Sequence, residues 1–305
     1  MTEREGMDTR QALLVDAFTG EPLTGNPAGV VPDADGLDDE QMGAIASELG
    51  ASETAFVTDS ADADRRIRYF TPTNEVDLCG HATIASHAAL FERGEIDAGE
   101  HTLETNVGVL TITVDDDGLV WMTQDHPEIR RVDLEYDEVA DALGLDVAAL
   151  EDVGADLPLA RSTTGLPFLM IPVNFMDHLR AVEPDMAAIE ALSERAETAG
   201  VYAFTFDTLD GDATLHARMF APKEGVPEDP VTGTASGACG AYLREYDAFE
   251  KIPEEMIFEQ GHFVDRPGRV HVRARGEIEV GGRAVTALDG DLVVPESEDD
   301  EIIEV

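Results

Sequence analysis

The chain has 305 residues, and its 65 acidic against 20 basic residues give a formal net charge of −45 at pH 7. So negative a protein repels nucleic acids and anionic membrane surfaces, which excludes both as natural partners. Because 43% of the residues are hydrophobic, the acidity does not indicate disorder. The length favours a folded protein with two core units.

The basic residues are nearly all arginines, since Lys223 and Lys251 are the only lysines. An acidic, lysine-poor composition spread over a whole chain is typical of adaptation to very high salt. At roughly 1 M salt, charges are screened beyond about 3 Å, so the self-repulsion of such a protein is largely removed. The composition therefore predicts a halophilic protein.

Cysteine content and apolar runs bear on the cellular compartment. Cys79 and Cys239 are the only cysteines, too few for the disulfide framework of a secreted protein. The first residues, MTEREGMDTRQ, are charged and lack the apolar centre of a signal peptide. No apolar run reaches the roughly 18 residues of a membrane-spanning helix. We expect a cytoplasmic protein.

Short strands dominate the predicted secondary structure. They are expected where β-branched or alternating residues are bounded by Gly, Pro or Asp. In chain order the clearest strands cover residues 12–17, 65–70, 108–114, 119–123, 167–173 and 270–274. Helices are expected at residues 38–49, 81–93, 184–199 and 234–245. Together these elements indicate an α+β protein.

Two of the expected helices, at 81–93 and 234–245, begin directly after a glycine and are rich in Ala, Ser and Gly on nearly every face. Small side chains all round suit a helix enclosed by a curled sheet, where there is little room beyond the backbone. The sequence therefore predicts a curled sheet, or barrel, around each of these two helices.

An internal repeat indicates that the chain consists of two related lobes. Four pairs of segments recur in the same order, with the second copy 140 to 153 residues after the first. The pairs are 24–27 with 164–167, 55–56 with 203–204, 68–72 with 218–222, and 80–83 with 233–236. We expect pseudo-symmetric lobes at residues 11–127 and 128–290, followed by an acidic strand or tail at 291–305 that could return to the first lobe.

The two glycine-initiated helices place candidate binding groups at Gly80 and Gly233. The first N–H groups of a helix have no partner within it and carry partial positive charge, so they bind carboxylates. Two such helix starts facing each other across a cleft between the lobes would suit a small acid. The alternative is that both glycines only allow tight turns from strand to helix.

Polar residues near these helix starts are candidates for chemistry. Glu53 leads directly into an apolar strand, where a carboxylate could serve as a general base. A solvated glutamate at a strand entry is the alternative. His81 lies at the first helix start and Asp229 shortly before the second. A lone histidine in such a place is also compatible with a purely structural role.

Several segments resemble the successive signatures of the PhzF-like family of phenazine biosynthesis, over residues 14–269. They are residues 16–19, 22–28, 52–56, 70–72 through 80–83, and 228–235. The resemblance implies the diaminopimelate-epimerase-like fold, in which two similar barrels each enclose a helix and the active site lies between them. It also implies a homodimer.

The resemblance also implies residue roles. Glu53 matches the acid/base of the family, which takes a proton from carbon and returns it at another position without a cofactor. His81 and Asp229 match the residues that hold a substrate amino or hydroxyl group. The remaining candidate substrate-binding residues are Asn26, Gly80, Gly233 and Thr234, where Thr234 stands in place of the serine that is common in the family.

Cys79 leaves other functions open. In related epimerases and racemases of this fold, two cysteines at the helix starts exchange protons, but the second position here is Thr232. A Cys/Thr pair resembles the dehydratase variant of the fold, so a dehydratase or epimerase using Cys79 is one alternative. A ligand-binding protein without turnover is another, and Cys79 could also be only a small packed residue.

The sequence predicts neither a metal nor a cofactor. Its cysteines and histidines show no zinc-binding spacing, and there is no phosphate-binding loop or dinucleotide fingerprint. The expected partner is a small anionic metabolite, bound by a few local donors within a strongly negative protein.

Overall fold

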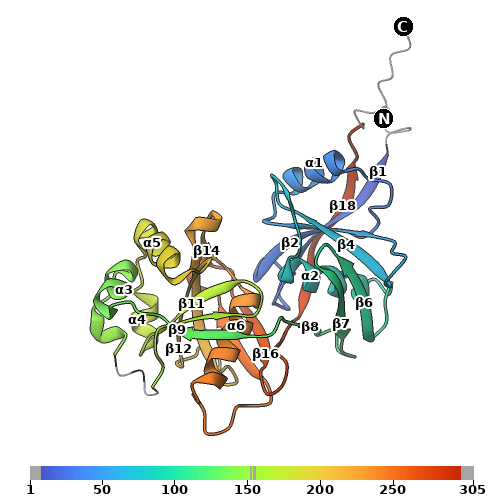
Figure 1. Ribbon diagram of the computed structural model, residues 1–305. Helices are drawn as coiled ribbons and strands as arrows, with labels where there is room; N and C mark the ends of the chain where they lie inside the picture. The colour runs from blue at the N-terminus through green and yellow to red at the C-terminus, as the bar shows by residue number, and fades with distance from the viewer. Residues whose placement is uncertain (1–7, 152, 154–155, 297–305) are drawn as a thin grey trace. The chain divides into compact units, whose positions relative to one another are not determined.

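The computed structural model describes residues 8–151, 153 and 156–296, and it divides into two compact units (Figure 1). The described part of the first unit comprises residues 8–23, 27–120 and 283–296, and that of the second comprises residues 24–26, 121–151, 153 and 156–282. Part of the expected acidic tail, at 297–305, lies outside the described residues. We propose that these units are the two lobes of the repeat.

The first unit is a mixed sheet with two helices. Its strands are β1 (Thr9–Ala17), β2 (Asn26–Val31), β3 (Thr54–Thr58), β4 (Arg65–Phe70), β5 (Glu75–Val76), β6 (Gly99–Thr105), β7 (Gly108–Val114) and β18 (Ala284–Val293). Its helices are α1 (Asp39–Leu49) and α2 (Gly80–Glu92). The strands pair in the order β18, β1, β2, β3, β4, β6, β7, with the short β5 also on β4.

The second unit holds the remaining elements. Its strands are β8 (Val120–Thr123), β9 (Glu128–Arg131), β10 (Ala160–Thr163), β11 (Pro167–Pro172), β12 (Gly200–Thr205), β13 (Leu215–Ala221), β14 (Val226–Asp229), β15 (Met256–Gln260), β16 (Gly268–Arg273) and β17 (Glu279–Gly282). Its α-helices are α3 (Tyr136–Leu143), α4 (Met176–Arg180), α5 (Met186–Ala196) and α6 (Gly233–Glu245). The single turns are η1 (Val147–Ala149), η2 (Pro222–Glu224) and η3 (His262–Val264).

The strand pairing of the two units is the same. In the first, β2 pairs with β3 in parallel, β3 with β4 antiparallel, and β4 with β6 in parallel across α2. In the second, β11 pairs with β12 in parallel, β12 with β13 antiparallel, and β13 with β15 in parallel across α6. Each strand from β10 to β16 therefore has a counterpart from β1 to β7.

The sheet registers correct one of the four repeat pairs. Thr54 lies opposite Gly29 and Phe70, whereas Val201 lies opposite Leu169 and Phe220. Since the two neighbouring strands repeat as predicted, Thr54 corresponds to Val201. The expected match of residues 55–56 with 203–204 is therefore wrong by one residue, because a match of two common residue types cannot fix a register.

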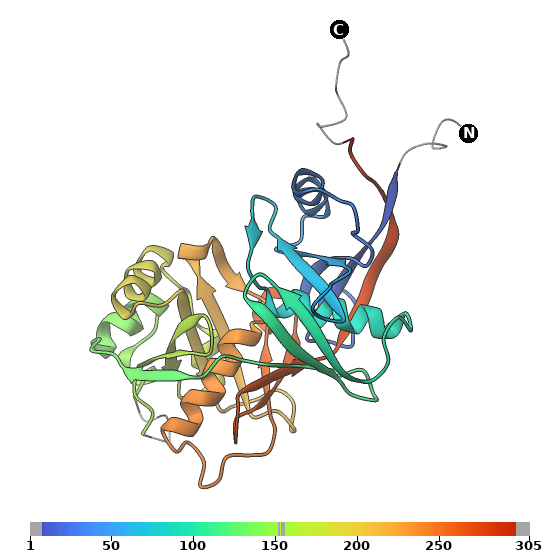
Figure 2. The same ribbon diagram turned by 45° about the vertical axis from the view of Figure 1, so that its right-hand side comes forward.

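Each sheet curls around one helix, as predicted. α2 packs against β18 and β7, which stand at opposite ends of the strand order, and also against β1 and β3. α6 packs in the same way against β9, β10, β11, β16 and β17. In the turned view of Figure 2, each helix lies among the strands of its own unit. A Cβ at Gly240 would come within 2.6 Å of Val272 Cγ1, which explains the small residues.

Most predicted elements match the structure within a few residues, and the clearest difference is in the second unit. The helix expected at 184–199 is α5, residues 186–196, and a separate short helix, α4, precedes it. In α5 the Asp185 side chain accepts hydrogen bonds from the N–H groups of Ala187 and Ala188, which sets its start. Among the described residues, no helix is both long and apolar enough to cross a bilayer.

A buried histidine in α2 makes the stability of the protein depend on pH. His87 is 3% exposed, and its Nδ1–H donates to Thr83 O at 2.9 Å. Burial lowers the pKa of His87 from 6.5 to about 4. Because the unfolded chain protonates first, this contribution to stability is complete above pH 6.5 and is lost as the pH falls towards 4.

We expect the protein to lose about 3 kcal/mol of unfolding free energy from His87 between pH 7.5 and pH 4. Other groups also titrate in this range, so the comparison is with His87→Leu, which cannot titrate. Urea denaturation at both pH values should show a smaller loss in the variant. Equal losses in the two proteins would show that His87 is not buried in its neutral form.

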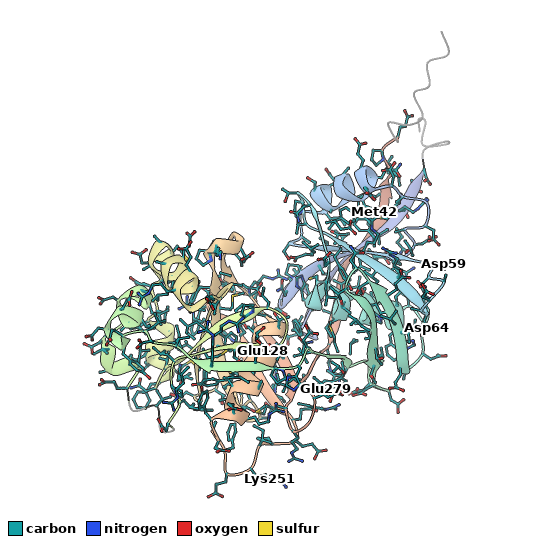
Figure 3. The ribbon with its side chains drawn as sticks, in the orientation of Figure 1. Met42, Asp59, Asp64, Glu128, Lys251 and Glu279 are labelled. Carbon is teal, nitrogen blue, oxygen red and sulfur yellow. The ribbon has the colours of Figure 1, made fainter. Side chains whose placement is uncertain are left out.

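Acidic side chains are spread over both units. Asp59, Asp64 and Glu128 are exposed examples (Figure 3). We propose that the protein is halophilic, and expect its melting temperature to rise as KCl increases from about 0.01 M to about 1 M, where the screening length falls from about 30 Å to about 3 Å. A melting temperature that stays constant or falls in this range contradicts the proposal.

Candidate active site

An arginine–glutamate pair fixes the short hairpin that leads into each central helix. Arg68 donates to both carboxylate oxygens of Glu75 at 2.8 and 2.7 Å, and Arg218 donates to both of Glu228 at 2.8 Å. Each guanidinium also lies over the ring of the phenylalanine two residues later, at 5.1 and 5.0 Å. Each glutamate precedes the first helical glycine by the same five positions. The same arginine–glutamate pair therefore fixes the segment before the start of both helices.

A buried tyrosine fixes the first turn of each helix. Thr83 Oγ1 donates to Cys79 O at 2.7 Å, and Tyr69 contacts the same Oγ1 at 2.6 Å. In the second unit, Ser236 Oγ donates to Thr232 O at 2.9 Å and contacts the hydroxyl of Tyr202 at 3.2 Å. Both helix starts are thus attached to the surrounding sheet.

Glu53, Cys79 and His81 form one cluster in the first unit, which we call the glutamate cluster. His81 Nε2 lies 3.4 Å from Glu53 Oε2 and 3.4 Å from Ser52 Oγ, while its Nδ1 lies 3.3 Å from Cys79 Sγ. The side chains of His81 and Glu53 are 13% and 24% exposed. Glu53 is held by its backbone, because its carbonyl accepts from Gly29 N at 2.9 Å at the edge of β3.

Asn26, Asp229, Thr232 and Gln260 form a second cluster, the aspartate cluster, in the second unit. Asn26 Nδ2 donates to Asp229 Oδ1 at 3.0 Å and to Val231 O at 2.8 Å, and Thr232 Oγ1 donates to Asp229 Oδ2. Gln260 Nε2 donates to Asp229 O at 2.8 Å, and Gln260 Oε1 accepts from Thr232 N at 3.2 Å. Each carboxylate oxygen of Asp229 therefore accepts a hydrogen bond from a different segment, and these bonds fix the orientation of the carboxylate.

The residues before the two glycines do not cap their helices with side chains. Cys79 and Thr232 are the N-cap residues of α2 and α6, and neither side chain accepts a hydrogen bond from its helix backbone. They contact His81 and Asp229 instead. This leaves the helix N–H groups at Gly80 and Gly233 as possible donors to an anion. Thr234 is half-buried in the first turn of α6.

The structure thus groups the predicted site residues within each unit. Glu53, Cys79 and His81 come together at the start of α2, and Asn26, Asp229 and Thr232 at the start of α6. Gln260 is an addition, because nothing in the sequence marks this strand residue as a support of Asp229. The donor atoms of Glu53, Cys79 and His81 all lie within 4.8 Å of one another, so this set could also hold a divalent metal ion.

Comparison with known proteins decides which family has this arrangement. The family model described as "Phenazine biosynthesis-like protein" matches residues 15–290, which include both clusters. The chain belongs to this PhzF family. An uncharacterized isomerase, YfhB of Bacillus subtilis, is 36% identical over 95% of this chain and 98% of its own length. An uncharacterized isomerase of Escherichia coli, YddE, is 37% identical over 86% of this chain and 89% of its own length.

Solved structures confirm the predicted fold of this PhzF-family protein. A crystal structure of a phenazine biosynthesis protein of the PhzF family from Bacillus anthracis has a TM-score of 0.85 and is 36% identical, covering 94% of this chain and 100% of that one. A hydroxyproline epimerase from Agrobacterium vitis has a TM-score of 0.59 at 14% identity, covering 95% of this chain and 94% of that one, a likeness of fold alone.

In this PhzF-family chain, the candidate base Glu53 has no equivalent side chain in the second unit. With the corrected register, the counterpart of Glu53 in the second unit is Gly200. A Cβ at Gly200 would come within 2.4 Å of Phe220 O and within 2.9 Å of Ala221 Cβ. No side chain fits there, so the repeat supplies one glutamate and leaves its equivalent position empty. Thr232 and Thr234 likewise replace Cys79 and His81, which leaves Glu53 without a second base from the repeat.

Proposed function

We propose that the protein is a cofactor-independent isomerase of a small carboxylic acid, in which Glu53 moves a proton between two carbons. The contact that most supports the proposal is the 3.4 Å approach of Glu53 Oε2 to His81 Nε2 at the start of α2. It places a carboxylate base beside an imidazole and near helix N–H groups. The curated relatives named as isomerases agree with this reaction class.

The proposed reaction needs one base and balances without an external reagent. Glu53 takes a proton from a substrate carbon, and the C–H electron pair becomes delocalised into the substrate as an enolate-like anion. The protonated Glu53, whose side chain is 24% exposed, exchanges its proton with water. It then gives a proton to another carbon of that anion and returns to the carboxylate. The backbone N–H at Gly80, at the start of α2 in the same unit as Glu53, would stabilise the negative charge that develops.

Two charged or polar side chains would hold the substrate. Asp229 is aimed by Asn26 and Thr232, so it is suited to accept hydrogen bonds from a substrate amino or hydroxyl group. His81 would donate to or polarise the same kind of group. A substrate that carries an amino or hydroxyl group would suit either side chain.

A dehydratase or epimerase that uses Cys79 is the second candidate. Its support is the 3.3 Å contact between Cys79 Sγ and His81 Nδ1, because a histidine can activate a thiol. Thr232 stands at the equivalent position of the second unit and has no comparable acidity, so a two-thiol exchange is not proposed. A binding protein without turnover is distinguished from both because it exchanges no carbon-bound hydrogen.

The proposal is tested by a screen for both binding and turnover. The protein is incubated in D₂O at high salt with a mixture of small amino, hydroxy and unsaturated carboxylic acids, which is then analysed by mass spectrometry. We expect one compound to be converted to an isomer of unchanged formula, apart from deuterium gained at carbon. A product lighter by one water supports the dehydratase instead, and binding without deuterium gain supports the binding protein.

A further inference from the structure

Both ring nitrogens of His81 have neighbours of known hydrogen-bonding character. An ionised carboxylate can only accept hydrogen bonds, whereas a thiol or a serine hydroxyl can donate. Glu53 Oε2 and Ser52 Oγ each lie 3.4 Å from Nε2, and Cys79 Sγ lies 3.3 Å from Nδ1. The proton of a neutral His81 must be on one of these two nitrogens.

Only one placement of that proton satisfies all three neighbours. With the proton on Nδ1, the lone pair of Nε2 would face the carboxylate of Glu53, which is repulsive. With the proton on Nε2, Glu53 and Ser52 can both accept it, and the lone pair on Nδ1 is free to accept from the Cys79 thiol. The chain of contacts is then thiol to imidazole to carboxylate.

We infer that Cys79 is a positioning residue, whose thiol donates to His81 Nδ1 and so keeps the His81 proton on Nε2, directed at Glu53. The inference rests on the proposed function for its use in turnover, but the arrangement itself can be observed without a substrate. It assigns Cys79 a role other than that of a nucleophile or base. A neutral His81 with a fixed Nε2–H is a defined donor beside the general base.

Cys79 is suited to this role by its place in the fold. It is the N-cap residue of α2, and its carbonyl accepts from Thr83 Oγ1 at 2.7 Å, so its backbone is fixed relative to the first helical turn. Cys79 as a whole residue is 9% exposed, which limits competition from water for hydrogen bonds at its sulfur. Cys239, the other cysteine, is fully buried in α6 and provides a matched control.

The tautomer of His81 is read from the nitrogen NMR spectrum of protein labelled with ¹⁵N-histidine, in high salt with EDTA to remove metal ions. The His81 signals are assigned by their loss in His81→Gln. We expect the Nε2–H form in the unaltered protein, in Cys79→Ser and in Cys239→Ser. In Cys79→Ala, where only Glu53 still favours this form, we expect a measurable increase in the Nδ1–H form. Ser52→Ala should leave the tautomer unchanged, because Glu53 still accepts from Nε2–H and Cys79 still donates to Nδ1.

Two spectroscopic results would overturn the inference. One is a His81 in the Nδ1–H form, or protonated on both nitrogens as the partner of a thiolate. The other is a Cys79→Ala spectrum with an unchanged tautomer. Neither depends on a substrate, so they are separate from failure of the proposed function, which the screen above would show as absence of turnover.

Activity gives a second readout once a substrate acid has been found. We expect Cys79→Ser to keep most of kcat, because serine also donates to Nδ1, and Cys79→Ala to lose at least about tenfold in kcat with a smaller change in KM. If Cys79 were the chemical base, Cys79→Ser would be nearly inactive. Alkylation of Cys79 should inactivate the protein in either case. The activity of Cys79→Ser therefore distinguishes a positioning role from a role as the chemical base.

Discussion

Glu53→Gln should lower turnover by about 10²- to 10⁴-fold, the usual contribution of a general acid/base. Glutamine preserves the shape of the side chain and its contact with His81 but cannot accept and return a proton. Since the position is partly exposed and its backbone carbonyl makes the bond to Gly29, the unfolding free energy should change little. The rate is measured on the acid identified by the screen, and stability by urea denaturation.

The matched control for this substitution is Glu48→Gln. Glu48 lies exposed on α1, so the same loss of one charge occurs away from the glutamate cluster. We expect the control to keep full activity. Binding of the acid to the Glu53→Gln protein should be nearly unchanged in a thermal-shift measurement. Full turnover in Glu53→Gln would show that another group moves the proton.

Arg218→Met should destabilise the second unit by about 3–5 kcal/mol, as expected when one partner of a buried ion pair is removed. The side chains of Arg218 and Glu228 are only 8% and 15% exposed. Arg218 Nη1 also donates to Leu179 O at 3.2 Å and Val182 O at 2.9 Å. The substitution would leave a charged carboxylate and two carbonyls without this donor.

The repeat supplies a control for Arg218→Met. Arg68→Met removes the equivalent pair of the first unit, where the side chains of Arg68 and Glu75 are more exposed, at 19% and 29%. We therefore expect a smaller loss of unfolding free energy, measured by urea denaturation at high salt. Equal losses, or a loss below about 1 kcal/mol for Arg218→Met, would mean that burial does not govern the strength of this pair.

The sequence repeat predicted the fold well because it depends on features that both copies keep. The glycine-initiated helices of small residues and the strand segments around Arg68 and Arg218 are local patterns with the same order in each half. Their structural meaning follows from packing, since a helix enclosed by strands has no room for larger side chains. The α+β fold with a helix inside each sheet was therefore predictable.

The exact division of the chain between the two units could not be read from the repeat, which assigned residues 284–290 to the second lobe and expected only the segment at 291–305 to return to the first. β18, residues 284–293, pairs with β1 in the first unit, with Thr9 opposite Val293 and Ala17 opposite Ala284. The pairing of β9 with β10 is its counterpart in the second unit, but neither β1 nor β18 lies in one of the repeated sequence segments. A strand contributed from the far end of the chain leaves no local signal, because hydrogen bonds between strands depend on register and not on sequence distance.

The candidate site was predictable where a motif carries it and unpredictable where support comes from elsewhere in the chain. Glu53, His81 and Asp229 lie in short recognisable segments, whereas Gln260 supports Asp229 from β15 without any motif of its own. The absence of a counterpart to Glu53 also became visible only from the strand registers, which place Gly200 at the equivalent position.

The most direct test of the central claim is the fate of the substrate hydrogen in D₂O. The unaltered protein and Glu53→Gln are each incubated with the acid found by the screen, and deuterium at each carbon is followed by NMR. We predict that the unaltered protein adds deuterium at the carbon that receives the proton and that Glu53→Gln adds none at either carbon. Isomerisation with deuterium gain that continues in Glu53→Gln would contradict the assignment of Glu53 as the acid/base.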